Sequence, residues 1–137
     1  MRDVRPAAVA GTFYPGNAAE LAVAVRECLA GTAAPVAPAA SPKALIVPHA
    51  GYVYSGPIAA GAYARLASLR STIRRVVILG PTHRVAVRGL ALPSARAFAT
   101  PLGDVEVDRE AVATLAGLRQ VVVSDSAHAL EHSLEVQ

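Results

Sequence analysis

The sequence has 137 residues, of which 53% are hydrophobic and 17% charged, with a formal net charge of +3. This length suits one domain rather than two, and the apolar content argues against intrinsic disorder. The 13 basic residues form no block of like charge, which disfavours a nucleic-acid partner, and the single cysteine excludes an internal disulfide and a multi-cysteine zinc site.

The first predicted element is a helix that begins after Asn17, because Asn17 and Glu20 have the spacing of a capping box. Apolar residues follow near helical spacing, and Gly31 can end the helix. Cys28 falls on the apolar stripe and is most simply a core residue. Residues 31–42 hold three prolines among small polar residues and are predicted to form a loop inside one domain.

A strand-helix-strand unit is predicted next. Residues 43–47 form a short apolar run that suits a strand buried on both faces, and residues 74–79 form a second one. Between them, Ser55 is the expected N-cap of a helix with Pro57 in its first turn. Such a unit has parallel strands and a right-handed crossover.

The rest of the chain alternates strands and helices, which places the protein in the α/β class with a mixed or parallel sheet. A last helix is expected over residues 127–137, with His128, Glu131, His132 and Glu135 on one face. The other predicted features are, in order, a strand over 87–92, a turn over 100–103, a strand over 105–107, a helix from Asp108 to Leu115 and a strand over 120–123.

Two histidines follow the strands of the predicted unit. His49 comes two residues after the first strand and His83 four residues after the second. Ligands of open α/β sheets bind beyond the carboxyl ends of the strands, so both imidazoles could converge on one metal ion. A lasting site would want a third, often anionic, ligand. The alternative is that each histidine only hydrogen-bonds a carbonyl.

Other candidate residues leave more than one interpretation open. Ser55 with the helix start at Gly56 could hold an anion or act as an ordinary cap, and Tyr54 could line the crevice or pack under the loop. His132 and Glu135 could form a proton-relay pair or bind metal, or lie on a solvated helix face. The chain contains no G-x-S-x-G elbow, phosphate-binding P-loop or G-x-G-x-x-G fingerprint.

Five motifs taken together resemble the Memo family, also known as the B component of the AmmeMemoRadiSam system. The resemblance implies a three-layer αβα sandwich with a mixed or parallel central sheet, like class III extradiol dioxygenases. It implies His49 and His83 as metal ligands and Tyr54, Ser55, His132 and Glu135 as pocket-lining candidates. The motifs are R-P-A (5–7), G-T-F-Y-P (11–15), P-H-A-G-Y-V-Y-S-G (48–56), L-G-P-T-H (79–83) and E-H-S-L-E-V-Q (131–137).

Family members are roughly twice as long, and their later half supplies a further histidine and a cysteine ligand. Residues 1–137 are therefore expected to be the N-terminal part of a single domain, with the sequence stopping inside a helix. Apolar strands normally covered by the other half would be left exposed. We expect this chain alone to aggregate or to bind metal weakly.

The resemblance implies a metal-binding protein with a dioxygenase-type cleft and redox chemistry, with iron as the first choice of metal and copper as the second. Whether the protein is an enzyme stays open. The alternative is a binding or scaffold module that holds a small molecule, peptide or protein in the same cleft, with an AMMECR-type protein and a radical SAM protein as implied partners. Metal-free acid–base catalysis by His132 and Glu135 is a weaker third hypothesis. No secretion signal or membrane span is readable, so a cytoplasmic location is expected.

Overall fold

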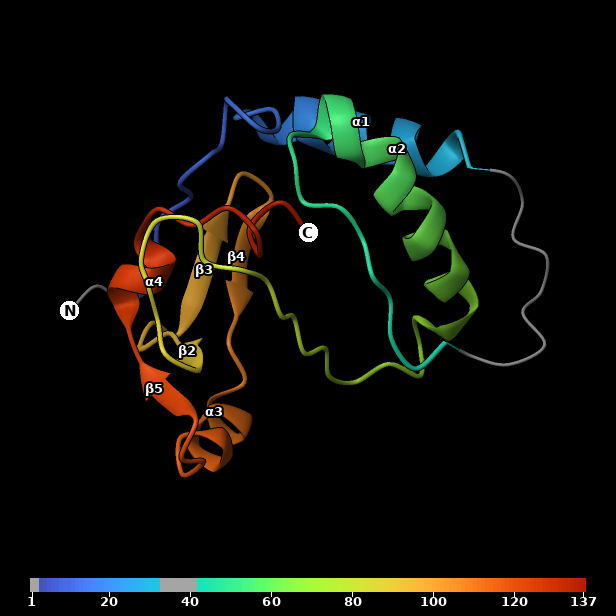
Figure 1. The fold of residues 1–137 in the computed structure, drawn as a ribbon. Coiled ribbons are helices and arrows are strands. Elements are labelled where there is room, and N and C mark those ends of the chain that lie inside the picture. The colour runs from blue at the N-terminus through green and yellow to red at the C-terminus, as the bar shows by residue number, and fades with distance from the viewer. Residues whose placement is uncertain (1–2, 33–41) are drawn as a thin grey trace.

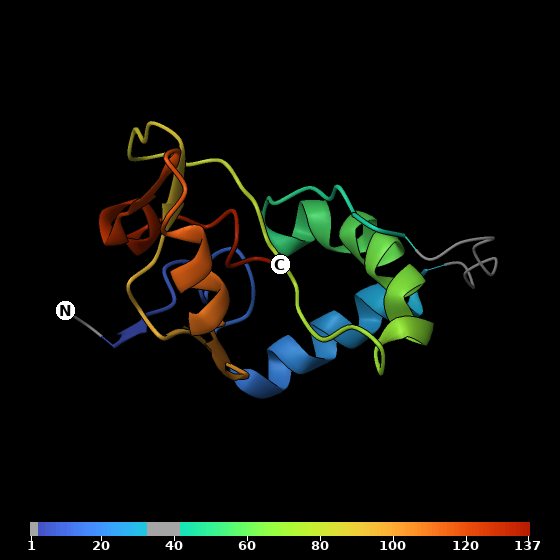
Figure 2. The same cartoon turned by 90° about the horizontal axis from the view of Figure 1, so that it is seen from below.

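The computed structural model describes residues 3–32 and 42–137. Helices α1 (Ala18–Ala30) and α2 (Tyr52–Tyr63) pack against each other on one side of the molecule. The strands lie on the other side together with α3 (Arg109–Leu115) and α4 (Asp125–Ala129), and residue 137 lies between the two parts (Figures 1 and 2).

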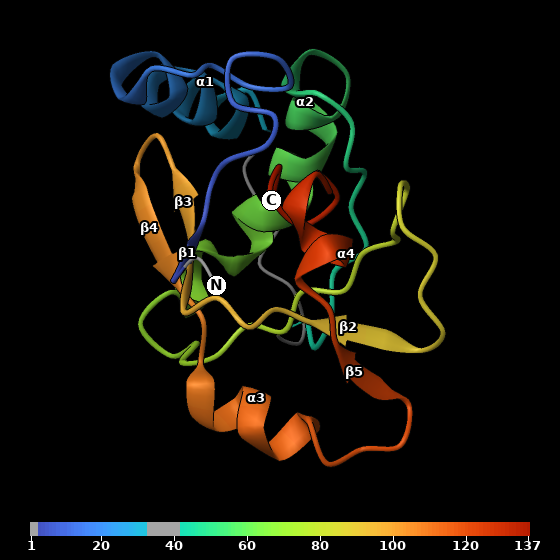
Figure 3. The ribbon, with the colours of Figure 1, turned by 90° about the vertical axis from the view of Figure 1, so that its left-hand side faces the viewer.

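The strands form two small sheets. In the first, β3 (Ala97–Thr100) pairs in parallel with β1 (Val4–Arg5) and antiparallel with β4 (Gly103–Glu106). In the second, β2 (Leu90–Leu92) pairs in parallel with β5 (Val121–Val123), as Figure 3 shows beside α4. The α/β class with mixed and parallel pairing is confirmed, but within the described ranges two sheets replace the expected single central one.

Two helix starts agree with the sequence prediction. The Asn17 side chain accepts hydrogen bonds from the amides of Ala19 (2.9 Å) and Glu20 (3.2 Å). Asp108 caps α3 by accepting from the amide of Ala111 at 2.9 Å. In each case the side-chain oxygen satisfies amides that the first helical turn leaves without a partner, so the local sequence suffices to begin the helix.

The start of α2 differs from the prediction. The helix begins at Tyr52 with Gly51 as its N-cap, so the assignment of Ser55 as the cap is wrong. The amide of Tyr52 donates to the carbonyl of Phe13 at 2.7 Å, which fixes the helix start four residues earlier. The hydroxyl of Ser55 is buried and donates to the carbonyl of Ala50 at 2.7 Å. After α2 the chain continues as a short 3-10 helix, Ala64–Leu69.

The two strands predicted at 43–47 and 74–79 do not form. Both segments are extended, but neither has a ladder partner among the residues that the structure describes. Their apolar side chains face solvent instead of a core, with Ile46 100% exposed and Leu79 75% exposed. A strand requires a neighbour about 4.8 Å away to take up its main-chain groups, and high apolar content cannot supply one. The expected aggregation of the chain stays a prediction.

The helix predicted over 127–137 is wrong beyond Ala129. Helix α4 covers only Asp125–Ala129, and turns follow. The side chain of Glu131 accepts from the amides of His132 (2.8 Å) and Ser133 (2.9 Å), which takes these amides away from a helical ladder. Competition of this kind between a side chain and the backbone explains the early helix end.

The core is small and lies where α1, α2 and the last residues of the chain meet. Tyr14, Leu21 and Val136 are buried together, with Phe13 and Tyr52 packed against them. Figure 1 shows the C-terminal residues running between the helices and the sheets, which agrees with Val136 in this cluster. The loop predicted over 31–42 falls largely on residues 33–41, outside the described ranges. None of the helices in the described chain is long and apolar enough to cross a bilayer.

Candidate metal centre

Three histidines from distant parts of the chain come together. The ring centroids of His83 and His132 lie 4.5 Å apart and nearly parallel, and His49 lies 5.3 Å from His83 and 5.9 Å from His132. One donor nitrogen from each ring lies within 4.8 Å of the other two. Two nitrogens bound to one ion at about 2.1 Å are at most ~4.2 Å apart, so a small inward shift of the rings would complete a three-nitrogen site.

Each histidine is placed by a different element. His49 lies in the extended segment before α2, His83 in the loop after Gly80, and His132 in the turn after α4. The ring of His132 packs on Phe13 with centroids 4.7 Å apart. Because the carbonyl of Phe13 also binds the start of α2, the N-terminal loop holds His49 and His132 in the same region.

The buried carboxylate of Glu131 joins the loops that carry His83 and His132. One oxygen lies 2.8 Å from Nδ1 of His83, and the other accepts from the His83 amide at 2.6 Å. The amides of His132 and Ser133 complete the set. Burial raises the pKa of Glu131, but these hydrogen bonds outweigh it and lower the pKa to about 2, so the group is a carboxylate at neutral pH.

The loops before His83 and around His132 also pack closely. A Cβ built on Gly80 would lie 2.7 Å from Oγ of Ser133, so only glycine fits there. The Ser133 hydroxyl donates to the carbonyl of Pro81 at 2.8 Å. Burial and the neighbouring His83 and His49 lower the pKa of His132, although Glu131 acts in the opposite direction. The neutral imidazole thus favoured is the form that binds metal.

Glu135, predicted beside His132, lies in a different environment. Its carboxylate forms a buried ion pair with Arg5 and accepts from the Tyr14 hydroxyl at 2.6 Å. It also accepts from the amides of Ala8 (2.8 Å) and Val9 (2.9 Å). These contacts hold the N-terminal segment against the end of the described chain and leave Glu135 no contact with His132 of the kind a proton relay needs.

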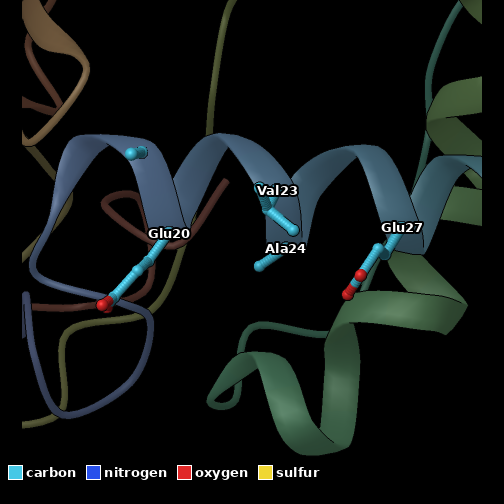
Figure 4. Close-up of a pocket in the computed structure, with 5 residues that line it drawn as sticks. Glu20, Val23, Ala24 and Glu27 are labelled. Atoms are coloured by element: carbon cyan, nitrogen blue, oxygen red, sulfur yellow. The ribbon is translucent and has the colours of Figure 1, made fainter.

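The other two pocket-lining candidates lie at the start of α2. Tyr54 is 79% exposed on the first turn of α2, and Ser55 is buried with its hydroxyl on backbone carbonyls. The open hollows on the described surface include two with different linings. One, of about 340 Å³, lies along α1, where Glu20 and Glu27 flank Val23 and Ala24 (Figure 4), and it contains no histidine or cysteine.

The other hollow adjoins the histidines. Its volume is about 630 Å³, and it is lined by Ile46, Val47, Pro48, His49, Ala50 and His132. The lining is apolar apart from the two imidazoles. This arrangement suits a ligand with an apolar body and a group that can reach a metal ion.

The sequence predicted the place of His49 and His83 and singled out His132, but it gave no role to Glu131 or Arg5. The available signal for Glu131 was its position directly before His132 in E-H-S-L-E. For Arg5 the signal was a basic residue followed by Pro6 near the N-terminus. Neither signal identifies a contact across more than a hundred residues, such as the one between Arg5 and the carbonyl of His128 at 2.9 Å.

The lowered pKa values of two buried side chains, Glu135 and His128, predict a loss of stability in acid. Hydrogen bonds from Tyr14 and the amides of Ala8 and Val9, with that of Arg5, outweigh burial and lower the pKa of Glu135 below its ordinary 4.5. Burial lowers the pKa of His128 below 6.5. In both cases the unfolded chain binds more protons, so the free energy of unfolding should decrease as the pH falls below 6.5 and decrease further below 4.5.

Urea unfolding between pH 7.5 and pH 3 measures this dependence. Glu135→Gln should reduce the lower part of the decrease, to which Glu131 also contributes, and His128→Asn should reduce the upper part, to which His132 also contributes. A free energy of unfolding that stays constant over the whole range would contradict the assignment.

Comparison with known proteins agrees with the motifs. A family model described as "Memo-like protein" matches residues 5–137. Among similar proteins, a MEMO1 family protein of Ignicoccus hospitalis is 45% identical over 98% of this chain and 50% of its own length. Another, from Methanocaldococcus jannaschii, is 39% identical over 100% of this chain and 50% of its own length. The chain thus spans about half the length of the curated relatives it matches.

Proposed function

This chain belongs to the Memo family, and from that premise we propose that it binds one metal ion through His49, His83 and His132. The observation that carries the proposal is the convergence of three imidazoles, with their donor nitrogens within 4.8 Å, from segments that are far apart in sequence. Histidines on solvated loops have no reason to meet in this way.

The donor set points to a transition metal. Imidazole nitrogen suits iron, copper, zinc and nickel better than calcium or magnesium. We propose iron, with copper as the second choice, and a dioxygenase-type cleft as the resemblance implies. A bound iron or copper ion would supply one-electron chemistry, while the chain would contribute three imidazole ligands, a nearby carboxylate on Glu131 and the apolar hollow beside His49.

A metal titration tests the proposal. Co²⁺ serves as a spectroscopic substitute for Fe²⁺, and we expect one ion per chain. Alanine at position 49, 83 or 132 should weaken binding by at least about 100-fold, since the loss of a partner outside the ligand set already costs ~10–100-fold. The fourth histidine provides the control, because Nε2 of His128 is bonded to the carbonyl of Ala91 at 3.1 Å, away from the cluster.

His128→Asn should therefore keep the affinity of the unmodified protein. Retention of that affinity in His49→Ala, His83→Ala or His132→Ala would remove the corresponding residue from the ligand set. Circular dichroism of each variant checks that the fold is kept.

The open apolar hollow also favours a second candidate function, a binding module for a peptide or protein. The partners proposed for it are an AMMECR-type protein and a radical SAM protein. Retention of a partner after metal removal by a chelator, in a protein without turnover, would favour this function over metal-dependent chemistry.

A further inference from the structure

Resting on the proposed metal site, the geometry assigns Glu131 as the residue that positions two of its three ligands, by fixing the ring of His83 and joining its loop to that of His132. Four donors converge on this one carboxylate. They are Nδ1 and the amide of His83 and the amides of His132 and Ser133, at 2.6 to 2.9 Å. The side chain of Glu131 is only 6% exposed, so water replaces none of these bonds.

The contact with the ring determines which nitrogen of His83 is available to a metal. A carboxylate can only accept hydrogen bonds, so Nδ1 of His83 must carry the proton that it donates to Glu131. The remaining lone pair is then on Nε2. A carboxylate behind a histidine ligand also makes the imidazole a stronger donor to the metal.

The hydrogen bonds from the backbone amides join the loop of His83 to that of His132. His83 and Glu131 are 48 positions apart in sequence, and their loops meet through this side chain and through the Ser133 hydroxyl on Pro81. Glu131 therefore sets the separation of His83 and His132, whose rings lie 4.5 Å apart. His132 itself is held through its amide, since its Nδ1 is 3.6 Å from the carboxylate, too far for a hydrogen bond.

Glutamine has the shape of glutamate but can replace it only in part. Its single oxygen can serve either the His83 amide or the ring and amides on the other side, and its NH₂ group then faces an N–H donor. With its oxygen toward the ring and the amides of His132 and Ser133, glutamine leaves only the His83 amide without an acceptor, so Glu131→Gln should keep His83 in the Nδ1–H form. Glu131→Ala removes the acceptor altogether. It should release His83 toward the Nε2–H form and weaken Co²⁺ binding by about 10–100-fold.

Nitrogen-15 NMR of the imidazole rings in the metal-free protein measures the form of His83 directly, and Co²⁺ titration measures the affinity. Glu110→Ala is the matched control, because Glu110 is exposed on α3 and its replacement should change neither result. Ser133→Ala removes the loop contact to Pro81 without touching the carboxylate. It should lower stability and leave the His83 ring in the Nδ1–H form.

The two readouts separate the possible failures. An Nε2–H form of His83 in the unmodified protein would overturn the positioning role, and so would an unchanged form in Glu131→Ala. The first result can be obtained even if the variant does not fold. An Nδ1–H form that shifts as expected, in a protein that binds no Co²⁺, would support the ring contact but overturn both its role toward a metal and the proposed function.

Discussion

Replacing Glu135 by alanine should lower the free energy of unfolding by about 3–5 kcal/mol, the cost of leaving a buried charge without its partner. The carboxylate and the Arg5 guanidinium are 2% and 6% exposed, so water cannot take the place of the missing group. The substitution would also strand the amides of Ala8 and Val9 and the hydroxyl of Tyr14. Each is a buried or half-buried donor with no other acceptor among the residues that the structure describes.

Equilibrium unfolding in urea, followed by circular dichroism, measures this effect. The ion pair between Arg96 and Asp3 provides the control, because its side chains are 52% and 73% exposed. Arg96→Ala should produce no measurable change, as is usual for solvated pairs. Equal effects of the two substitutions would contradict the view that the Arg5–Glu135 pair holds the N-terminal segment in place.

Replacing Gly89 by alanine should cost on the order of 3 kcal/mol, from backbone strain of ~1–2 kcal/mol and a steric clash of ~1–3 kcal/mol. Gly89 has a φ of +93°, and a Cβ there would lie 2.1 Å from the carbonyl oxygen of Gln120. The same carbonyl accepts from the amide of Leu90 at 2.8 Å at the start of the β2–β5 pairing. Backbone must therefore move, and the parallel pairing should be lost at this end.

Gly103→Ala separates the two contributions. Gly103 also has a positive φ, +120°, but a Cβ there would meet nothing within 4 Å. This variant should show the strain without the clash, and so a smaller loss in the free energy of unfolding. A loss as large as that of Gly89→Ala would mean that the clash with the carbonyl of Gln120 adds nothing to the loss in the free energy of unfolding.

Features encoded within a few neighbouring residues were predictable from the sequence. The caps at Asn17 and Asp108 and the turn at 100–103 require only local side chains and a glycine, and the structure has all of them. The strand at 120–123 was also predicted, and it forms as β5. Strand β3 was missed, because A-F-A-T alternates too weakly to stand out.

Features that depend on a distant partner were not predictable. The apolar run at 74–79 has the composition of a buried strand, yet Val76 and Val77 are each 70% exposed in the described structure. The residues at 131–135 have helical spacing, but the carboxylate of Glu131 takes up amides that a helix would need. In both cases the local pattern is consistent with the prediction and the contacts elsewhere in the chain decide otherwise.

The residues of the candidate site were likewise predictable only in part. Strand-end positions indicated His49 and His83, and the structure does place them together even though their strands do not form. The third ring belongs to His132, which the sequence had offered, together with Glu135, as a proton-relay partner, a metal ligand or part of a solvated helix face. Its place in the cluster depends on Phe13 and on the loop contacts of Glu131, none of which periodicity can reveal.

The Arg5–Glu135 ion pair joins residues that are far apart in sequence, and this separation affects how the protein folds during synthesis. These residues are 130 positions apart, and the Glu131–His83 bond joins positions 48 apart. Closing loops of this size costs chain entropy before any contact compensates for it, which slows folding. During synthesis His49 and His83 emerge well before Glu131 and His132. The three imidazoles can therefore assemble only after His132 has been synthesised and its loop has closed onto those of His49 and His83.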